Sequence, residues 1–274
     1  MSTETRDFRN VVSGKIERND PETFLGKEVD VYYRYNWALG IMLQRSSDQQ
    51  LRVLELGCGL GWFGRVLEQH FGGRVRYVGV DLDQAAIEEA SRRSAGGKGL
   101  EYKQGDICRL EDLNLQANSF DFVIWFENLE HVRPANFLDL VDTVRGFLKP
   151  GGQLLVEVPN RIGGGGLRAS GPLRKSSSRY SRGQHNPHHY FEPTLEEARF
   201  LFPGASIEGF EPGEQLLALK GVARGLANLI HRLFRPACHI ERGGMIRDQD
   251  LAYLAMYRRL PRWNRAFLIR EVMP

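Results

Sequence analysis

Short apolar runs that alternate with amphipathic segments are the feature that most constrains the fold of this chain. Alternation of this kind, with short turns between the segments, is typical of a parallel β-sheet covered by helices on both faces. We therefore predict an α/β fold. Seven strands are expected, at residues 52–56, 75–80, 101–104, 120–126, 153–158, 206–210 and 266–272.

Helices are predicted where apolar residues recur at spacings of three and four. Thr194 and Glu197 have the spacing of a capping box, which marks a helix start. Residues 149–152, Lys-Pro-Gly-Gly, are a helix-stop signal. Residues 21–43 predict one or two helices that precede the sheet. The other predicted helices are 62–71, 84–94, 136–148 and 194–201.

The length of the chain favours one decorated domain over two. Its 274 residues, 42% of them hydrophobic, suffice for one α/β core with appended helices. We expect an N-terminal tail and cap helices over residues 1–50 and a single domain over 51–274. Within that domain, residues 160–190 are expected to form a basic loop, and residues 214–260 a helical insertion before the last strand.

The positive charge of the chain is local. The formal net charge is +3, yet six bases and no acid lie between Glu157 and Glu192. A general nucleic-acid binder, whose basic face usually dominates the domain, is therefore not expected. The basic loop is either a solvated insertion or a lid whose arginines hold an anionic substrate group, and we favour the lid.

The chain has no predicted membrane segment and no predicted disulfide framework. No apolar run approaches the roughly 20 residues that a membrane span needs, and the polar start lacks the apolar stretch of a secretory signal. Cys58, Cys108 and Cys238 form no CxxC pair, which also argues against a thiolate zinc site. We expect a cytoplasmic protein with reduced thiols.

The sharpest local signal is the string Glu-Leu-Gly-Cys-Gly-Leu-Gly at residues 55–61, between a predicted strand and a predicted helix. Glycines permit a turn with positive φ and let a ligand approach the backbone, while the following helix presents free N–H groups. Trp62 stands where a dinucleotide fingerprint has its third glycine, which disfavours a nicotinamide dehydrogenase.

Further landmarks follow at residues 77–81 (YVGVD), 105–107 (GDI), 120–124 (FDFVI), 129–132 (LEHV) and 148–152 (LKPGG). Together with the glycine string they resemble the motifs of class I S-adenosylmethionine-dependent methyltransferases, over about residues 51 to 160. Residues 34–38 (RYNWA) resemble, more loosely, an element of bacterial relatives that act on glycans and other small molecules. The resemblance implies a Rossmann-like, mostly parallel sheet with an antiparallel last strand, and S-adenosylmethionine as cofactor.

The resemblance also implies roles for single residues. Asp81 would bind the ribose hydroxyls, Asp106 the adenine amino group and Glu55 the ammonium of the methionine end, while Ile107 would cover the adenine ring. Each acid alone could instead be structural, as a satisfied strand-end acid, a helix N-cap or a turn residue. The predicted cofactor-binding residues are Arg34, Tyr35, Glu55, Gly57, Cys58, Gly59, Gly61, Asp81, Leu82, Asp106, Ile107 and Phe126.

Methyl transfer needs in-line orientation and, for a hydroxyl acceptor, a general base. His131, His185 and His189 are the candidate catalytic residues, although a structural hydrogen bond is the alternative for His131. An aromatic residue such as Phe126 more often packs in the core than touches a ligand, and Cys58 is expected to be a small loop residue and not a nucleophile. A metal site of Glu127, Glu130, His131 and the later histidines His185, His188 and His189 is a further alternative, but the family mostly works without metal.

The function most consistent with these patterns is methyl transfer to a small molecule, giving an O-methyl product on a sugar, a polyketide or a similar acceptor. The acceptor could carry an anionic group, and neither a nucleic acid nor a membrane is expected as partner. A silent cofactor-binding subunit and a protein or RNA methyltransferase are the alternatives; residues 127–130 lack the Asn/Asp-Pro-Pro-Tyr/Phe motif common in amino-directed enzymes. Monomer and homodimer are equally compatible with the sequence.

Overall fold

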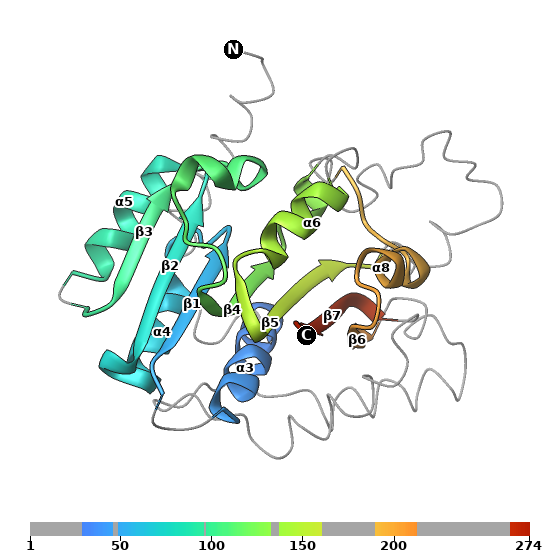
Figure 1. Cartoon of the computed structure of the whole chain (residues 1–274), viewed down its shortest axis with the longest axis horizontal. Coiled ribbons are helices and arrows are strands. Elements are labelled where there is room, and N and C mark those ends of the chain that lie inside the picture. Colours follow the sequence, from blue (N-terminus) through green and yellow to red (C-terminus); the bar gives the residue numbers. More distant parts are fainter. Residues whose placement is uncertain (1–28, 46–48, 96, 133–136, 161–189, 213–263) are drawn as a thin grey trace, which may run out of the picture.

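The computed structural model describes residues 29–45, 49–95, 97–132, 137–160, 190–212 and 264–274 (Figure 1). Within them, one seven-stranded sheet has the order β3-β2-β1-β4-β5-β7-β6. The first five strands pair in parallel, and β7 is antiparallel to both β5 and β6, which confirms the predicted fold class. The strands are β1 (Leu51–Leu56), β2 (Val75–Asp81), β3 (Leu100–Gln104), β4 (Phe120–Phe126), β5 (Leu148–Pro159), β6 (Ser206–Pro212) and β7 (Asn264–Val272).

Helices cover both faces of the sheet, because the central strands are apolar on both sides. In β4, Phe122 and Ile124 pack with α3 and α4, whereas Val123 and Trp125 pack with α6 and α8. A strand buried on both faces is a continuous apolar run, which is why this one is easily recognised in the sequence. The helices are α3 (Val29–Leu43), α4 (Trp62–Phe71), α5 (Gln84–Arg93), α6 (Phe137–Arg145) and α8 (Leu195–Leu201), with 3-10 helices η1 (Gly72–Arg74), η2 (Ile107–Leu113) and η3 (Leu129–His131).

The turn before β5 differs from the prediction. α6 ends at Arg145, and Leu148 already pairs with Phe120, so residues 149–152 belong to β5 and do not terminate a helix. Gly151 has a φ of 72°. The Gly151 N–H donates to the carbonyl of Met273, which follows β7, at 3.1 Å, and the Met273 N–H donates to the carbonyl of Gly152 at 2.9 Å. These glycines therefore bend a paired strand, and the predicted helix over 136–148 is too long at its carboxyl end.

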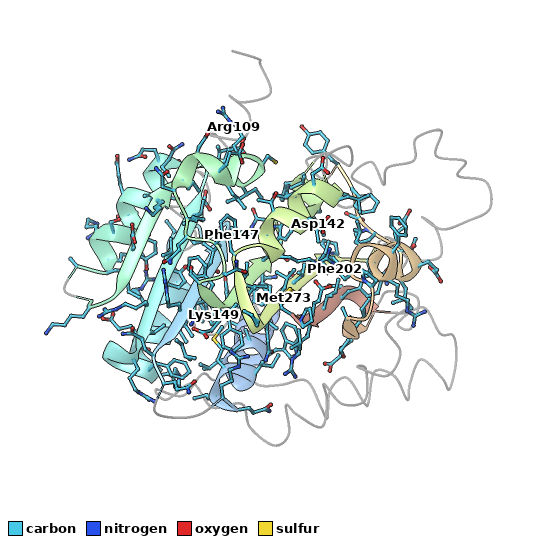
Figure 2. The ribbon with its side chains drawn as sticks, in the orientation of Figure 1. Arg109, Asp142, Phe147, Lys149, Phe202 and Met273 are labelled. Atoms are coloured by element: carbon cyan, nitrogen blue, oxygen red, sulfur yellow. The ribbon has the colours of Figure 1, made fainter. Side chains whose placement is uncertain are left out.

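The start of α8 agrees with the capping-box prediction. The Glu197 N–H donates to Thr194 Oγ1 at 3.2 Å, and the Thr194 N–H donates to Glu197 Oε2 at 2.8 Å. Arg145 at the end of α6 donates to the carbonyl of Leu201 at 3.0 Å and to Glu271 of β7, which ties three elements together. Phe202, directly after α8, is fully enclosed between this helix layer and the sheet (Figure 2).

Several predicted segments lie outside the described residues. These are most of the N-terminal tail, almost all of the 160–190 loop and the whole 214–260 insertion, and with them His185 and His189. The nearest described residues on either side of the predicted insertion, Pro212 and Asn264, belong to β6 and β7, which are neighbours in the sheet. No helix among the described residues is both long and apolar enough to cross a membrane.

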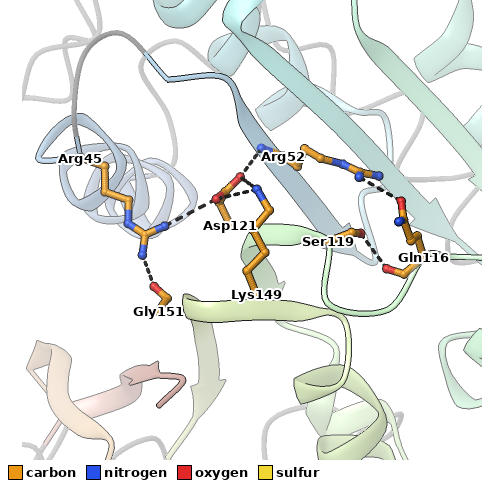
Figure 3. Close-up of polar contacts among 7 residues, drawn as sticks. All are labelled: Arg45, Arg52, Gln116, Ser119, Asp121, Lys149 and Gly151. Atoms are coloured by element: carbon orange, nitrogen blue, oxygen red, sulfur yellow. Dashed lines mark hydrogen bonds and ion pairs between the residues drawn. The ribbon is translucent and has the colours of Figure 1, made fainter.

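A polar cluster holds α3 to the amino-terminal edge of the sheet (Figure 3). Both carboxylate oxygens of Asp121, on β4, lie 2.9 Å from the Lys149 ammonium, and one accepts the Arg52 N–H at 2.8 Å. Arg45, just beyond α3, lies 3.7 Å from Asp121 and donates to the carbonyl of Gly151. One largely buried acid therefore joins β1, β4, β5 and the end of α3.

Asp121→Asn is expected to lower the free energy of unfolding by about 2 kcal/mol, because one acceptor is replaced by an amide that faces cationic donors. Urea denaturation monitored by circular dichroism measures this loss. Asp112→Asn is the matched control, since Asp112 pairs with Arg109 at 2.6 Å but both side chains are largely exposed. It should cost less than about 0.5 kcal/mol. Equal losses in the two variants would contradict the role of the Asp121 cluster.

Candidate functional site

A tight loop of residues 57–61 joins β1 to α4. Its glycines Gly57, Gly59 and Gly61 have φ angles of 76°, 49° and 64°, which residues with a side chain rarely adopt. The N–H groups of Gly57 and Cys58 both donate to the carbonyl of Val80, at 2.7 and 2.9 Å. The positive-φ turn expected from the glycine string is present, and it is fixed against the end of β2.

The three glycines differ in what lies in front of them. A Cβ on Gly57 would come within 3.0 Å of the Asn128 side chain, and one on Gly61 would come equally close to Tyr102. A Cβ on Gly59 would meet nothing within 4 Å. Gly57 and Gly61 therefore permit internal packing, whereas Gly59 borders open space. Open space over a glycine backbone is what a closely approaching ligand requires.

Asn128, directly after β4, is a structural component of the loop that was not predicted from the sequence. Its Nδ2 donates to the carbonyl of Phe126 at 2.8 Å and to that of Leu56 at 3.4 Å. It thereby bridges the ends of β4 and β1 beneath Gly57. A small polar residue at the carboxyl end of a buried strand could have indicated this, because the ends of parallel strands meet at one edge of the sheet.

Asp81 ends β2 beside the glycine loop. Its Oδ2 accepts the Gly59 N–H at 2.8 Å, and its Oδ1 accepts the Asp83 N–H at 3.0 Å. Burial raises the pKa of Asp81, while the backbone hydrogen bonds oppose the rise. The alternative of Asp81 as a helix cap is wrong, because the N-cap of α5 is Asp83, whose side chain accepts from the Ala85 N–H. Asp81 is thus held toward the open space at Gly59.

Asp106 and its neighbours lie after β3. Asp106 is exposed and accepts the Cys108 N–H at 2.8 Å, so it caps η2, a helix that was not predicted from the sequence. Ile107 packs partly against the core, and Leu82 is about half-exposed. The structural role of Asp106 as a turn residue is therefore real, and its adenine contact stays a prediction.

Glu55 is buried in β1 between two tyrosine hydroxyls. Tyr35 of α3 donates to its Oε1 at 3.0 Å, and Tyr77 of β2 donates to its Oε2. Burial raises the pKa of Glu55 to about 7, the charge of Asp81 adds to the rise, and the two hydroxyls oppose it. The carboxyl is therefore balanced between its neutral and its charged form, and a cation placed beside it would favour the charged form.

Arg34 and Tyr35, neighbouring residues of α3 that were both predicted to bind the cofactor, contact different partners. The Tyr35 ring stacks on Phe63 with centroids 4.6 Å apart and reaches Glu55. Arg34 instead forms ion pairs with Glu127 at 2.8 Å and with Glu157 at 3.1 Å, at the ends of β4 and β5. Phe126 is 5% exposed and packs within the core, as its structural alternative requires.

The segment after β4 is acidic and partly buried. Glu130 is 1% exposed, and burial followed by the charges of Glu127 and Glu157 raises its pKa well above the usual range. Its carbonyl accepts the Tyr190 N–H at 2.7 Å, which brings the chain after residue 189 beside η3. His131 is half-buried in η3. Its catalytic role stays a prediction.

Two further expectations concern metal and thiol chemistry. Within the described residues, no three His, Cys, Asp or Glu side chains are grouped so that they could hold a metal ion. This includes Glu127, Glu130 and His131, whereas the later histidines of the predicted metal alternative, His185, His188 and His189, lie outside the described residues. Cys58 is 5% exposed, and burial raises its pKa well above the usual range, which disfavours a thiolate nucleophile there.

The candidate site lies along the carboxyl edge of the strands, on both sides of a topological switch. The strand order runs outward in opposite directions from β1 and β4, and open α/β sheets bind ligands at such a point. The glycine loop, Asp81 and Asp106 lie on the β1-β2-β3 side, and Glu127 and Glu157 on the β4-β5 side. The residues on the β1-β2-β3 side can bind a nucleoside-like ligand that has a cationic group near Glu55. The two acids on the β4-β5 side border that ligand site.

Comparison with known proteins agrees with this geometry. A family model described as "Methyltransferase domain" matches residues 53–152. Over 145 residues the chain is 33% identical to the ubiquinone biosynthesis O-methyltransferase of Nitrosococcus oceani, covering 52% of this chain and 58% of that protein. It is 33% identical over 140 residues to the fatty-acid O-methyltransferase of Mycolicibacterium smegmatis, covering 51% and 48%.

A solved S-adenosylmethionine-dependent methyltransferase of Archaeoglobus fulgidus shares the fold, with a TM-score of 0.53, 17% identity and coverage of 88% of this chain and 94% of that one. The chain spans about half the length of the curated relatives that it matches. The matched segment contains the glycine loop, Asp81 and Asp106. The chain therefore contains a class I S-adenosylmethionine-dependent methyltransferase domain.

Proposed function

We propose that the chain binds S-adenosylmethionine over the 57–61 loop and transfers its methyl group to a hydroxyl of a small molecule. The observation that carries the proposal is the open space at Gly59, flanked by a carboxylate whose two oxygens are fixed by backbone N–H groups. A side chain at Gly59 would fill that space. The residues present thus fit a ligand that approaches the backbone and offers hydroxyl groups to Asp81.

The proposed division of roles follows from the chemistry of the two ends of the donor. Asp81 accepts hydrogen bonds from the ribose hydroxyls, and Asp106 with Ile107 and Leu82 holds the adenine. Glu55 binds the ammonium of the methionine end, with Tyr35 closing over it. The bound donor supplies an electrophilic methyl group on its sulfonium, so the protein has to orient the acceptor oxygen and accept its proton.

The acceptor differs between the two curated relatives described above, whereas the methylated atom does not. Their names give ubiquinone biosynthesis and a fatty acid, and both describe an O-methyltransferase. We propose a hydroxyl of a sugar, a polyketide or a similar secondary metabolite as the acceptor. His131, close to the end of β4, is our candidate for the general base.

Isothermal titration calorimetry with S-adenosylhomocysteine tests the donor part of the proposal. The wild-type chain should bind it, and Asp81→Ala should weaken binding about 30-fold, because the carboxylate acceptor of the ribose hydroxyls is lost. Asp83→Ala is the matched control. It removes the α5 cap two residues away and should cost about 1 kcal/mol of stability without changing donor affinity. A folded wild-type chain that binds no S-adenosylhomocysteine would refute the proposal.

A further inference from the structure

Tyr77, on β2, is a buried tyrosine that contacts the proposed methyl-donor site through Glu55. Its side chain is 1% exposed, and its hydroxyl donates to Glu55 Oε2. Burial, followed by the charge of Glu55, raises the pKa of this hydroxyl well above its usual range, so the hydroxyl keeps its proton. Tyr77 therefore always offers a hydrogen bond to the acid that is proposed to bind the ammonium of S-adenosylmethionine.

The strand register explains how the Tyr77 side chain reaches Glu55. Glu55 on β1 and Tyr102 on β3 are the two register partners of Gly79 on β2. Tyr77 precedes Gly79 by two residues, so the two residues lie on the same face of the sheet. Because Gly79 has no side chain, the Tyr77 ring can extend past it towards Glu55. A Cβ on Gly79 would lie 2.9 Å from Cε1 of the Tyr77 ring.

A second glycine, Gly64 on α4, also borders the Tyr77 ring. A Cβ on Gly64 would lie 2.7 Å from Tyr77 Cε1 and 2.9 Å from the Tyr102 hydroxyl. Neither Gly64 nor Gly79 has a positive φ, so the backbone conformation does not require a glycine at either position. A glycine inside a helix or a strand is less stable there than an alanine. The close packing of the Tyr77 ring gives a reason for both glycines.

Tyr102 contacts the Tyr77 ring from β3 and is itself bonded to the glycine loop. The two rings meet edge to face, with centroids 5.7 Å apart. The Tyr102 hydroxyl donates to the carbonyl of Gly61 at 3.2 Å and lies 3.0 Å from Ser94 Oγ, just after α5. Contacts from α4, β2 and β3 therefore fix the Tyr77 ring, and with it the place of the hydroxyl at Glu55.

We propose that Tyr77 is a positioning residue of the methyl-donor site: its hydroxyl orients the Glu55 carboxylate towards the ammonium of the bound donor. This inference rests on the proposed function and extends it to a residue that acts through Glu55 without touching the donor. A hydroxyl that donates to a carboxylate also favours the charged form, which is the form that binds a cation. The Tyr77 hydroxyl opposes the rise in the pKa of Glu55 more than the Tyr35 hydroxyl does.

Two ligands that differ at the methionine end test the proposal. S-adenosylhomocysteine carries the ammonium, whereas 5′-methylthioadenosine has the same nucleoside and lacks it. Both are titrated into the full chain by calorimetry at about pH 7. Tyr77→Phe, which keeps the ring and removes the hydroxyl, should weaken S-adenosylhomocysteine about tenfold and 5′-methylthioadenosine less than about twofold. An equal loss for both ligands is what a merely structural role predicts, and it would overturn the proposal.

A double variant shows whether Tyr77 acts through Glu55. In the Glu55→Gln background, Tyr77→Phe should change the affinity for S-adenosylhomocysteine by less than about twofold, because the carboxylate on which the hydroxyl acts is absent. A second full loss in that background would contradict the proposal. A folded wild type that does not bind S-adenosylhomocysteine would refute the proposed function, whereas wild-type binding that Tyr77→Phe leaves unchanged would refute only this inference.

Gly64→Ala tests the packing of the ring, and Gly40→Ala is its matched control. Both glycines lie within helices, Gly40 on α3, and a Cβ on Gly40 would meet no atom within 4 Å. Gly64→Ala should weaken S-adenosylhomocysteine at least about tenfold, because the Tyr77 ring has to move away from its place at Glu55. Gly40→Ala should bind as the wild type does. Equal affinities of the two variants would show that the ring does not depend on Gly64.

Discussion

Gly57→Ala is expected to weaken binding of S-adenosylhomocysteine at least about 100-fold, the equivalent of about 3 kcal/mol. The new Cβ would come within 3.0 Å of the Asn128 amide, at a backbone φ of 76°. Asn128 cannot withdraw easily, because its amide donates to the carbonyls of Phe126 and Leu56. The loop has to shift instead, and the N–H groups beside the open space at Gly59 shift with it. Calorimetric titration measures the loss.

Substitutions at two other glycines separate the effect of backbone strain from the effect of the clash with Asn128. Gly59→Ala meets no atom within 4 Å, so it should cost only the left-handed strain, about 1 kcal/mol of stability, while its methyl group fills the proposed donor space and blocks binding. Gly72→Ala has a similar φ of 55° and open surroundings at the end of α4, away from the loop. Because its ψ of −137° lies outside the left-handed helical region, it should cost at least as much stability, and donor affinity should stay normal. Gly57→Ala binding within tenfold of wild type would contradict the assignment of the loop.

The parts of the site that the sequence predicts are those encoded by local patterns. The positive-φ turn follows from the spacing of Gly57, Gly59 and Gly61, and the place of Asp81 follows from an apolar strand that ends in an acid. Both signals are complete within a few residues, because strand, turn and helix start are contiguous. The order of the first five strands then brings the loop and Asp81 together, since parallel strands present their carboxyl ends at one edge.

The parts that the sequence does not predict depend on contacts between distant segments. Arg34 and Glu157 are 123 residues apart, and nothing near either one identifies the other. The placement of Asn128 beneath the glycine loop likewise requires β4 to lie beside β1. The helix expected to end near residue 148 is shorter because pairing with β4 and with the carboxyl terminus, a tertiary effect, draws the Lys-Pro-Gly-Gly segment into β5.

Donor affinity is expected to rise with pH through about 7, and the titrating group is Glu55. Burial raises its pKa to about 7, so the carboxyl is largely neutral at lower pH. The charged form is the one that binds the donor ammonium, and the ammonium itself stays protonated below about pH 7. Affinity for S-adenosylhomocysteine should therefore fall about tenfold per unit as the pH drops below 7. The loss reaches about 100-fold near pH 5.

Substitutions of Glu55 and of its hydrogen-bond partner Tyr35 identify the group that causes this pH dependence of donor affinity. Glu55→Gln should remove the step and leave weak binding at every pH, because the amide cannot carry the charge. Tyr35→Phe keeps the ring on Phe63 but removes a hydroxyl that stabilises the carboxylate, so the midpoint should move to higher pH. Asp81, whose pKa is also raised by burial, is the competing source of a step. A step that persists in Glu55→Gln would assign the titration to Asp81 and exclude Glu55 as the group that binds the ammonium.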